Sequence, residues 1–162
     1  MSSPAQDAIV LKQAESPSEL EAVRELWLEY ARSLGFSLCF QNFEHDLANL
    51  PGDYGAPSGT LVLAKVGAEY AGCIALHARG EDICEMKRLY VRPAFRGREL
   101  GRLLAERLIA DARAMGYRRM RLDTIPRLMG TAVELYRDLG FYEIAPYYTN
   151  PIEGAIYMEL EL

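Results

Sequence analysis

The feature that most constrains the fold is an apolar strand end, a basic glycine-bearing turn and an amphipathic helix that follow one another directly. The strand end is Leu89-Tyr90-Val91, the turn is Arg96-Gly97-Arg98-Glu99-Leu100-Gly101, and the helix runs on to Met115. A helix start leaves about four backbone N–H groups without partners and carries roughly half a positive charge, so it attracts anions. Glycines there let a ligand approach closely, and a diphosphate would match the charge of Arg92, Arg96, Arg98 and Arg102.

The length, composition and net charge of the chain indicate the class of protein. Its 162 residues suit a single domain spanning 1–162, and half of them are apolar and a quarter charged, as in ordinary globular proteins. The net charge of -5 argues against nucleic acid or an anionic membrane surface as the partner. The basic turn stands out against this acidic background, which favours a small anionic ligand.

Cysteine and histidine usage indicates neither a metal site nor a disulfide framework. Cys39, Cys73 and Cys84 have no pairing or metal-ligand spacing, and His45 and His77 stand alone. We therefore expect no bound metal, and structural thiols in a reducing compartment. The chain shows no basic start followed by an apolar stretch, and no run approaches the roughly 20 apolar residues that span a bilayer. The expectation is a cytoplasmic protein without a membrane partner.

Helix and turn signals organise the first part of the chain. Ser16-Pro17-Ser18-Glu19 is typical of a helix start, with Ser16 and Glu19 as a capping box, and Ser18 with Glu21 is an equal candidate. Apolar residues then recur at steps of three and four until Gly35 ends the helix. The flanking segments are expected to be a strand at 9–11, a second helix at 42–50 and a loop at 51–59.

Strand signals dominate the middle of the chain and return at its end. Lys87 and Arg88 interrupt the apolar alternation of one expected strand, which indicates a β-bulge, and Gly67-Ala68 suits a tight hairpin. The expected strands are 60–66, 70–78, 83–91, 117–123, 141–144 and 155–162, and the later helices are 100–115, ended by Gly116, and 132–139. This order predicts an α+β fold with a single mixed, mostly antiparallel sheet flanked by helices.

The basic turn gains meaning from a second stretch, Leu135-Tyr136-Arg137-Asp138-Leu139-Gly140-Phe141. Together the two segments resemble the GNAT superfamily of acyl-CoA-dependent N-acetyltransferases, over about Cys84 to Tyr142. The resemblance implies the GNAT fold, with the coenzyme A diphosphate at the turn and pantetheine against the main chain of the strand end. The residues that it assigns to acetyl-CoA are Leu89, Tyr90, Val91, Arg96, Gly97, Arg98, Glu99, Leu100, Gly101 and Arg102. Glu99 takes a place usually held by Gly, and Met129 a place where many relatives have Asn.

The same resemblance implies two catalytic roles. Tyr136 would protonate the departing thiolate of coenzyme A, a task that a phenol placed on sulfur can perform, although its helical spacing also suits a core tyrosine. Glu85 is the leading candidate for the base that deprotonates the acceptor, with a pKa raised by partial burial. A structural Glu85 paired with Lys87 or with an arginine of the neighbouring strand is an equal alternative. Asp123 is the reserve candidate for the base, unless it caps the following segment.

The acceptor side is marked by aromatic residues, which also suit a protein core. The expected substrate-binding residues are Trp27, Tyr30, Tyr148 and Asn150, with Phe36, Phe40 and Tyr147 as further wall candidates. The resulting hypothesis is an acetyltransferase that moves an acetyl group from acetyl-CoA to a primary amine of a small molecule or peptide by direct attack in a ternary complex. A non-catalytic acyl-CoA-binding or sensing domain is the alternative. Similar enzymes are frequently homodimers, so a homodimer stays an open expectation.

Overall fold

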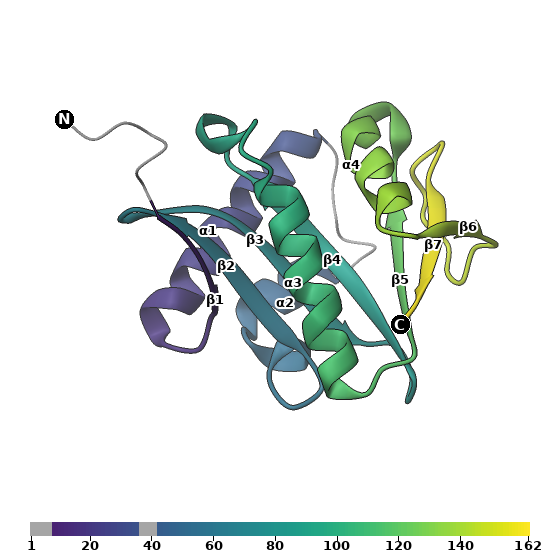
Figure 1. Cartoon of the computed structure of the whole chain (residues 1–162), viewed down its shortest axis with the longest axis horizontal. Coiled ribbons are helices and arrows are strands. Elements are labelled where there is room, and N and C mark those ends of the chain that lie inside the picture. Colours follow the sequence, from purple (N-terminus) through teal and green to yellow (C-terminus); the bar gives the residue numbers. More distant parts are fainter. Residues whose placement is uncertain (1–7, 36–41) are drawn as a thin grey trace.

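The protein is built on one seven-stranded sheet, seen in a computed structural model that describes residues 8–35 and 42–162 (Figure 1). The strand order is β1-β2-β3-β4-β5-β7-β6, in which β4 and β5 run parallel and the other neighbouring strands run antiparallel. The strands are β1 (Ile9–Gln13), β2 (Thr60–Val66), β3 (Glu69–Ala78), β4 (Ile83–Val91), β5 (Arg119–Thr124), β6 (Tyr142–Ile144) and β7 (Ile156–Glu161). The predicted α+β fold with a mixed, mostly antiparallel sheet is confirmed.

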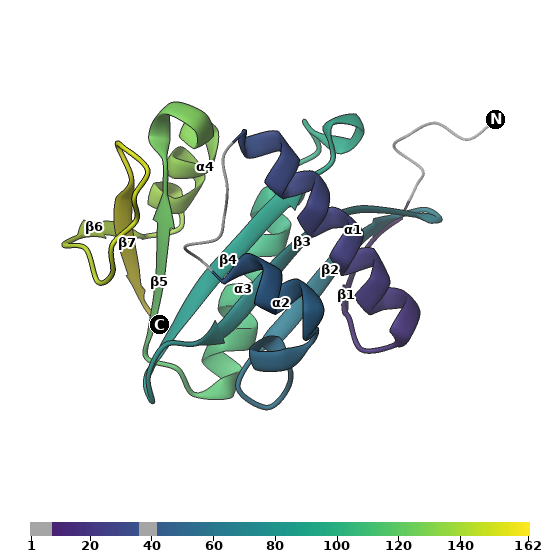
Figure 2. The ribbon, with the colours of Figure 1, turned by 180° about the vertical axis from the view of Figure 1, so that it is seen from behind.

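Helices cover both faces of this sheet, as Figures 1 and 2 show from opposite sides. Helices α1 (Pro17–Leu34) and α2 (Phe43–Ala48) lie on one face, and α3 (Leu100–Met115) and α4 (Pro126–Asp138) lie on the other. Each face has its own apolar cluster, so β2 sends Leu61 and Leu63 to the α1 side and Val62 and Ala64 to the α3 side. Burial on both faces explains why β2 reads as a nearly continuous apolar run.

The helix ends follow the sequence signals closely. Ser16 Oγ accepts a hydrogen bond from the Glu19 N–H, and the Glu19 carboxylate accepts one from the Ser16 N–H, so the structure selects Ser16 and Glu19 as the capping box. Gly35 ends α1 at φ +73°, and Gly116 ends α3 at φ +92°. Glycine adopts these left-handed angles without the steric cost that a Cβ would add, which is why both helices end there. No helix in the described part of the chain is long and apolar enough to cross a membrane.

The structural element that creates a cleft is the junction of β4 and β5. The two strands pair only through Ile83–Glu85 and Arg119–Arg121, and beyond this point they diverge (Figure 1). The expected β-bulge is present in β4, where the register with β3 shifts and Arg88 takes φ +58°. Because β4 keeps its pairing with β3 while it leaves β5, its far edge at 86–91 faces an open gap.

Two local predictions need correction. Helix α4 starts at Pro126 rather than at residue 132, because Pro126 suits the first helical position and the chain bends at Met129, which leaves helical φ and ψ. Residue Ile125 precedes this helix, so Asp123 is not its cap. The expected loop at 51–59 also contains a short 3-10 turn, Gly52–Tyr54.

Candidate active site

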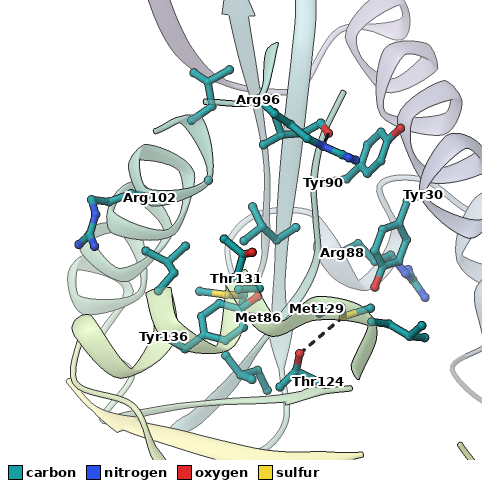
Figure 3. A pocket seen from close by; sticks show the side chains of 18 of the residues that line it. Tyr30, Met86, Arg88, Tyr90, Arg96, Arg102, Thr124, Met129, Thr131 and Tyr136 are labelled. Carbon is teal, nitrogen blue, oxygen red and sulfur yellow. Dashed lines mark hydrogen bonds between the residues drawn. The ribbon is translucent and has the colours of Figure 1, made fainter. Parts of the chain in front are cut away.

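A cleft with a volume of about 740 Å³ lies between β4 and β5 and is bordered by α1, α3 and α4. The sheet edge contributes Met86 to Val91 from β4 and Leu122 to Thr124 from β5. Figure 3 shows Arg102 and Tyr136 on one side of β4, and Tyr30 and Arg88 on the other. The cleft therefore passes through the sheet, and a ligand can reach the gap from the α3 side as well as from the α1 side.

The predicted anion-binding turn forms one end of the cleft. Arg96, Gly97, Glu99, Leu100, Gly101 and Arg102 all line it. The first intrahelical bond of α3 runs from the Leu103 N–H to the Glu99 carbonyl at 3.0 Å, so the amides of 100–102 precede the helical ladder. Gly97 has φ +86° with open space around it, which lets a ligand approach the backbone. The turn has the geometry of an anion site at a helix start.

Two of the four arginines are engaged elsewhere. Arg92 forms a bidentate ion pair with Glu29 of α1, with its Nη2 2.7 Å from the carboxylate, so it ties α1 to the sheet. Arg98 does not line the cleft, and its guanidinium lies 5.5 Å from the centre of the Phe95 ring. Arg96 donates from Nε to the Val91 carbonyl at 3.1 Å, and Arg102 pairs with Asp138 at 3.2 Å. Of the four arginines, Arg96 and Arg102 are thus the two that line the cleft.

Glu99, the departure from the usual glycine, adopts the backbone conformation that a glycine would favour. It precedes α3 at φ +60° and ψ 23°, its side chain makes no capping hydrogen bond, and the residue is exposed. A non-glycine residue in this left-handed region costs roughly 1–2 kcal/mol. The turn keeps its shape in spite of this cost, and Glu99 is at once exposed and part of the lining of the cleft.

Tyr136 lies in the wall of the cleft, on α4 (Figure 3). The residue is buried, and its ring packs 5.7 Å from that of Phe141. Burial raises the pKa of its phenol, and the nearby Tyr30 and Asp123 raise it further. The hydroxyl therefore stays protonated at neutral pH and can act as a proton donor inside the cleft.

Glu85 lies in a buried network of hydrogen bonds and ion pairs. It is completely buried, accepts hydrogen bonds from His77 Nε2 at 2.8 Å and Tyr147 OH at 2.5 Å, and does not line the cleft. Arg79 and Lys87 approach it at 3.9 and 4.0 Å. Burial alone would raise the pKa of Glu85, but the His77 hydrogen bond, the Lys87 charge and the Tyr147 hydrogen bond lower it to about 2. The pKa shift is therefore opposite in direction to the expected one, and Glu85 is paired with Lys87 and with an arginine directly after β3, as the structural alternative predicts. The role of Glu85 as the base stays a prediction.

Asp123, the reserve candidate for the base, is in contact with the cleft, where Glu85 was expected. It lines the cleft at the end of β5. Its Oδ2 accepts hydrogen bonds from Tyr148 OH and from Asn150 Nδ2, the latter at 2.7 Å. Tyr148 and Asn150, both expected to bind substrate, thus contact Asp123 from the loop between β6 and β7 and do not line the cleft themselves.

The remaining acceptor candidates divide between wall and core. Tyr30 lines the cleft, whereas Trp27 is 0% exposed. The guanidinium carbon of Arg88 lies 4.4 Å from the centre of the Trp27 ring. Trp27 belongs to the core because its ring packs against those of Phe43 and Tyr54. Phe36 and Phe40 lie outside the described residues, as does Cys39.

Sequence reasoning missed Lys87 and Arg88 as cleft residues, because it interpreted the pair as the mark of a bulge and Lys87 as a possible partner of Glu85. Both line the cleft, and the side chain of Arg88 is fully buried in an ion pair with Asp46 of α2 at 2.8 Å. Two adjacent charges in a strand whose other residues, apart from Glu85, are apolar were the available signal. Within residues 8–35 and 42–162, no group of three His, Cys, Asp or Glu side chains is arranged to hold a metal ion.

Comparison with known proteins connects this site to a family. The model described as the acetyltransferase (GNAT) family matches residues 20–141. An uncharacterized N-acetyltransferase of Schizosaccharomyces pombe is 43% identical over 148 residues, which cover 90% of this chain and 90% of that protein. The crystal structure of an acetyltransferase from Streptococcus agalactiae superposes with a TM-score of 0.77 at 22% identity, over 95% of this chain and 98% of that one. A putative acetyltransferase from Salmonella typhimurium, solved with its cofactor acetyl-CoA, gives 0.72 at 18% identity, over 95% and 94%.

Proposed function

Because the chain belongs to the GNAT family of acetyltransferases, we propose that it transfers an acetyl group from acetyl-CoA to a primary amine of a small molecule or peptide. The single observation that carries this proposal is the cleft that passes between β4 and β5, with the anion-binding turn at one end and Tyr136 inside it. A ligand with a diphosphate and a long thin arm fits such a cleft, and its reactive end would reach the middle of the sheet.

The residues present fit acetyl-CoA. The amides at the start of α3, with Arg96 and Arg102, would hold the diphosphate. The free edge of β4 at Leu89 to Val91 would pair with the amides of the pantetheine arm, as a strand pairs with an added chain. When bound, acetyl-CoA supplies an activated acyl group as a thioester. Every further contribution comes from the protein.

Tyr136 supplies the proton that the departing thiolate needs, because its phenol is protonated and faces the cleft. A main-chain N–H next to the bulge at Arg88 would stabilise the thioester oxygen as it gains negative charge, an effect usually worth about 3 kcal/mol. Both groups are held by regular elements, so they need little rearrangement during the reaction.

Attack by the amine is direct in this proposal. Cys73 and Cys84 are buried, neither lines the cleft, and burial raises the pKa of each thiol to about 12. A thiol in that state is a poor nucleophile at neutral pH. The amine therefore meets the acetyl group in a complex that holds both substrates.

The test is the release of free coenzyme A thiol from acetyl-CoA over a panel of amines, with acetyl-CoA binding measured in parallel. The proposal expects micromolar or tighter binding and amine-dependent thiol release. Binding without turnover across alkyl amines, amino acids, polyamines, aminoglycosides and peptides would favour an acyl-CoA-binding or sensing domain and refute the enzymatic proposal.

A further inference from the structure

The carboxylate of Asp123 is held firmly on one oxygen only. Both hydrogen bonds that it receives, from Tyr148 OH and Asn150 Nδ2, end on Oδ2. Within the part of the chain that the structure describes, Oδ1 accepts no hydrogen bond, although Asp123 lines the cleft. A carboxylate in this situation is oriented by the protein and keeps one oxygen for a ligand.

We propose that Asp123 binds the acceptor amine through Oδ1, that Tyr148 and Asn150 position it, and that the acceptor is a primary alkyl amine which enters as an ammonium ion. This inference rests on the proposed acetyl transfer and deepens it by naming the substrate class. Asp123 is the catalytic residue here because it touches the substrate, whereas the two loop residues act through it.

The loop that orients Asp123 is itself locked to β7. Tyr157 OH donates to the Tyr148 carbonyl at 2.7 Å and accepts from the Asn150 N–H at 2.9 Å. Asn150 Oδ1 accepts from the Ile152 N–H at 2.9 Å, which fixes the amide so that Nδ2 faces Asp123. The rings of Tyr148 and Tyr157 meet edge to face at 5.5 Å. With its backbone and side chains both engaged, the loop holds one arrangement around Asp123.

The cations near Asp123 have other carboxylates as partners. Lys87, which lines the cleft from β4, lies 4.0 Å from Glu85, and Arg88 lies 2.8 Å from Asp46. Neither Glu85 nor Asp46 lines the cleft. Asp123 is therefore the carboxylate at this end of the cleft whose charge is left for an incoming cation.

Reactive groups from other elements converge on Asp123. Tyr136 of α4 and Tyr30 of α1 line the same cleft as Asp123, and its charge adds to the burial that raises the pKa of both phenols. Tyr136 is the proposed proton donor to sulfur. An amine held on Oδ1 would thus lie within the same part of the cleft as the thioester that it attacks.

The cleft wall around this point defines the body of the acceptor. Tyr30 and Leu34 of α1 and Leu128 and Met129 of α4 line it, and Leu128 is 45% exposed although it is apolar. Figure 3 shows Met129 on the same side of β4 as Tyr30 and Arg88. A cationic head with an apolar or aromatic group behind it matches these surroundings.

The proton balance of the reaction closes with these groups. The ammonium ion gives one proton to Asp123, and the neutral nitrogen then attacks the carbonyl carbon, so that the C–N bond forms and the C–S bond breaks. The electron pair goes to sulfur, which takes a proton from Tyr136. The second proton of the nitrogen restores Tyr136, and Asp123 releases its proton to solvent.

Asp123→Asn tests the substrate class with benzylamine, an ammonium ion at neutral pH, and aniline, which is uncharged. We expect kcat/KM for benzylamine to fall about 30-fold and that for aniline less than about 3-fold, with the KM of acetyl-CoA unchanged. Glu161→Gln, an exposed carboxylate at the end of β7, is the matched control and should change neither amine. An equal loss for both amines, or none, would overturn the role of Asp123.

Tyr148→Phe tests the positioning role. It should lower kcat/KM for benzylamine about 5-fold in the wild-type background and have no further effect in Asp123→Asn, because the substitution keeps the ring and removes the hydroxyl, whose partner among the described residues is Asp123. Additive losses in the double variant would refute that route. Thermal unfolding checks that each variant is folded. Asn150→Ala combined with Asp123→Asn gives a second, independent double-mutant cycle on the same carboxylate. If the wild type acetylates no amine at all, the proposed function fails; if it acetylates benzylamine and aniline but Asp123→Asn keeps their ratio, only this inference fails.

Discussion

Replacing Glu99 with Gly probes the anion-binding turn with little risk to the fold. Glu99 has φ +60°, is exposed and lines the cleft, and it makes no capping hydrogen bond. Removing its side chain relieves roughly 1–2 kcal/mol of left-handed strain, while the freer unfolded glycine costs about 0.5–1 kcal/mol. The stability of the protein should therefore rise by between zero and about 1.5 kcal/mol.

The larger effect is expected on coenzyme A affinity. For an assumed separation of about 7 Å in water, each unit charge of the diphosphate repels the Glu99 carboxylate by about 0.6 kcal/mol. Two charges give about 1.2 kcal/mol, or about 8-fold in Kd at low salt. A Debye length of about 8 Å reduces this to about twofold at physiological ionic strength.

Isothermal titration of acetyl-CoA into Glu99→Gly and Glu99→Gln at two salt concentrations separates charge from backbone. Glu99→Gln keeps the side-chain shape and removes only the charge, so it should capture most of the tighter binding. Both gains should shrink as salt rises. Weaker binding by either variant would mean that Glu99 contacts the ligand favourably and that the diphosphate does not lie at this turn.

Three further changes separate the roles of Tyr136, Glu85 and Gly72. Tyr136→Phe should lower kcat for thiol release about 100-fold with little change in acetyl-CoA affinity, since general acid catalysis typically contributes this much; an unchanged kcat would remove Tyr136 from the mechanism. Glu85→Gln should leave the pH profile of the rate near neutrality unmoved, because Glu85 does not line the cleft. Its pKa of about 2, below the ordinary 4.5, stabilises the fold above about pH 4.5 by on the order of 3 kcal/mol, an amount lost as pH falls toward 2. In urea unfolding at several pH values, the free energy of unfolding of Glu85→Gln should therefore fall less steeply with decreasing pH than that of the wild type. An equally steep fall would contradict the pairing. Gly72→Ala places a Cβ 2.6 Å from the Tyr90 carbonyl and should cost about 2 kcal/mol in urea unfolding, whereas the control Gly80→Ala meets open space; equal stability of the two variants would refute the close approach of β3 and β4.

Local signals predicted most of the fold because each depends on neighbours in sequence. The capping box at Ser16 and the glycines at 35 and 116 fixed helix ends through backbone geometry that a few residues determine. The bulge at Arg88 was visible because two charges cannot both follow the alternation of a buried strand. The start of α4 was missed because Ile125 offers no capping side chain and Met129 breaks the helical period.

The sequence predicted the turn of the candidate site from local features, and it placed Tyr30 and Tyr136 at the cleft, but it did not predict how the carboxylates are paired. The turn at 96–101 needs a helix start, two glycines and arginines, all of them local features. The properties of Glu85 depend instead on His77 and Tyr147, which the fold brings from 8 and 62 residues away. The same holds for Asp123, whose partners Tyr148 and Asn150 arrive from a distant loop. Periodicity likewise cannot tell a helix residue in the core, such as Trp27, from one in a cleft wall.

The central claim is that an acetyl group passes directly from acetyl-CoA to an amine in this cleft. Rapid quench of the enzyme with isotopically labelled acetyl-CoA and benzylamine, followed by mass spectrometry of both protein and product, tests it most directly. The account predicts N-acetylbenzylamine in equal amount to free coenzyme A thiol, with no labelled protein when the amine is omitted. Labelled protein that passes its acetyl group to a later addition of amine, or thiol release without acetylated amine, would contradict it.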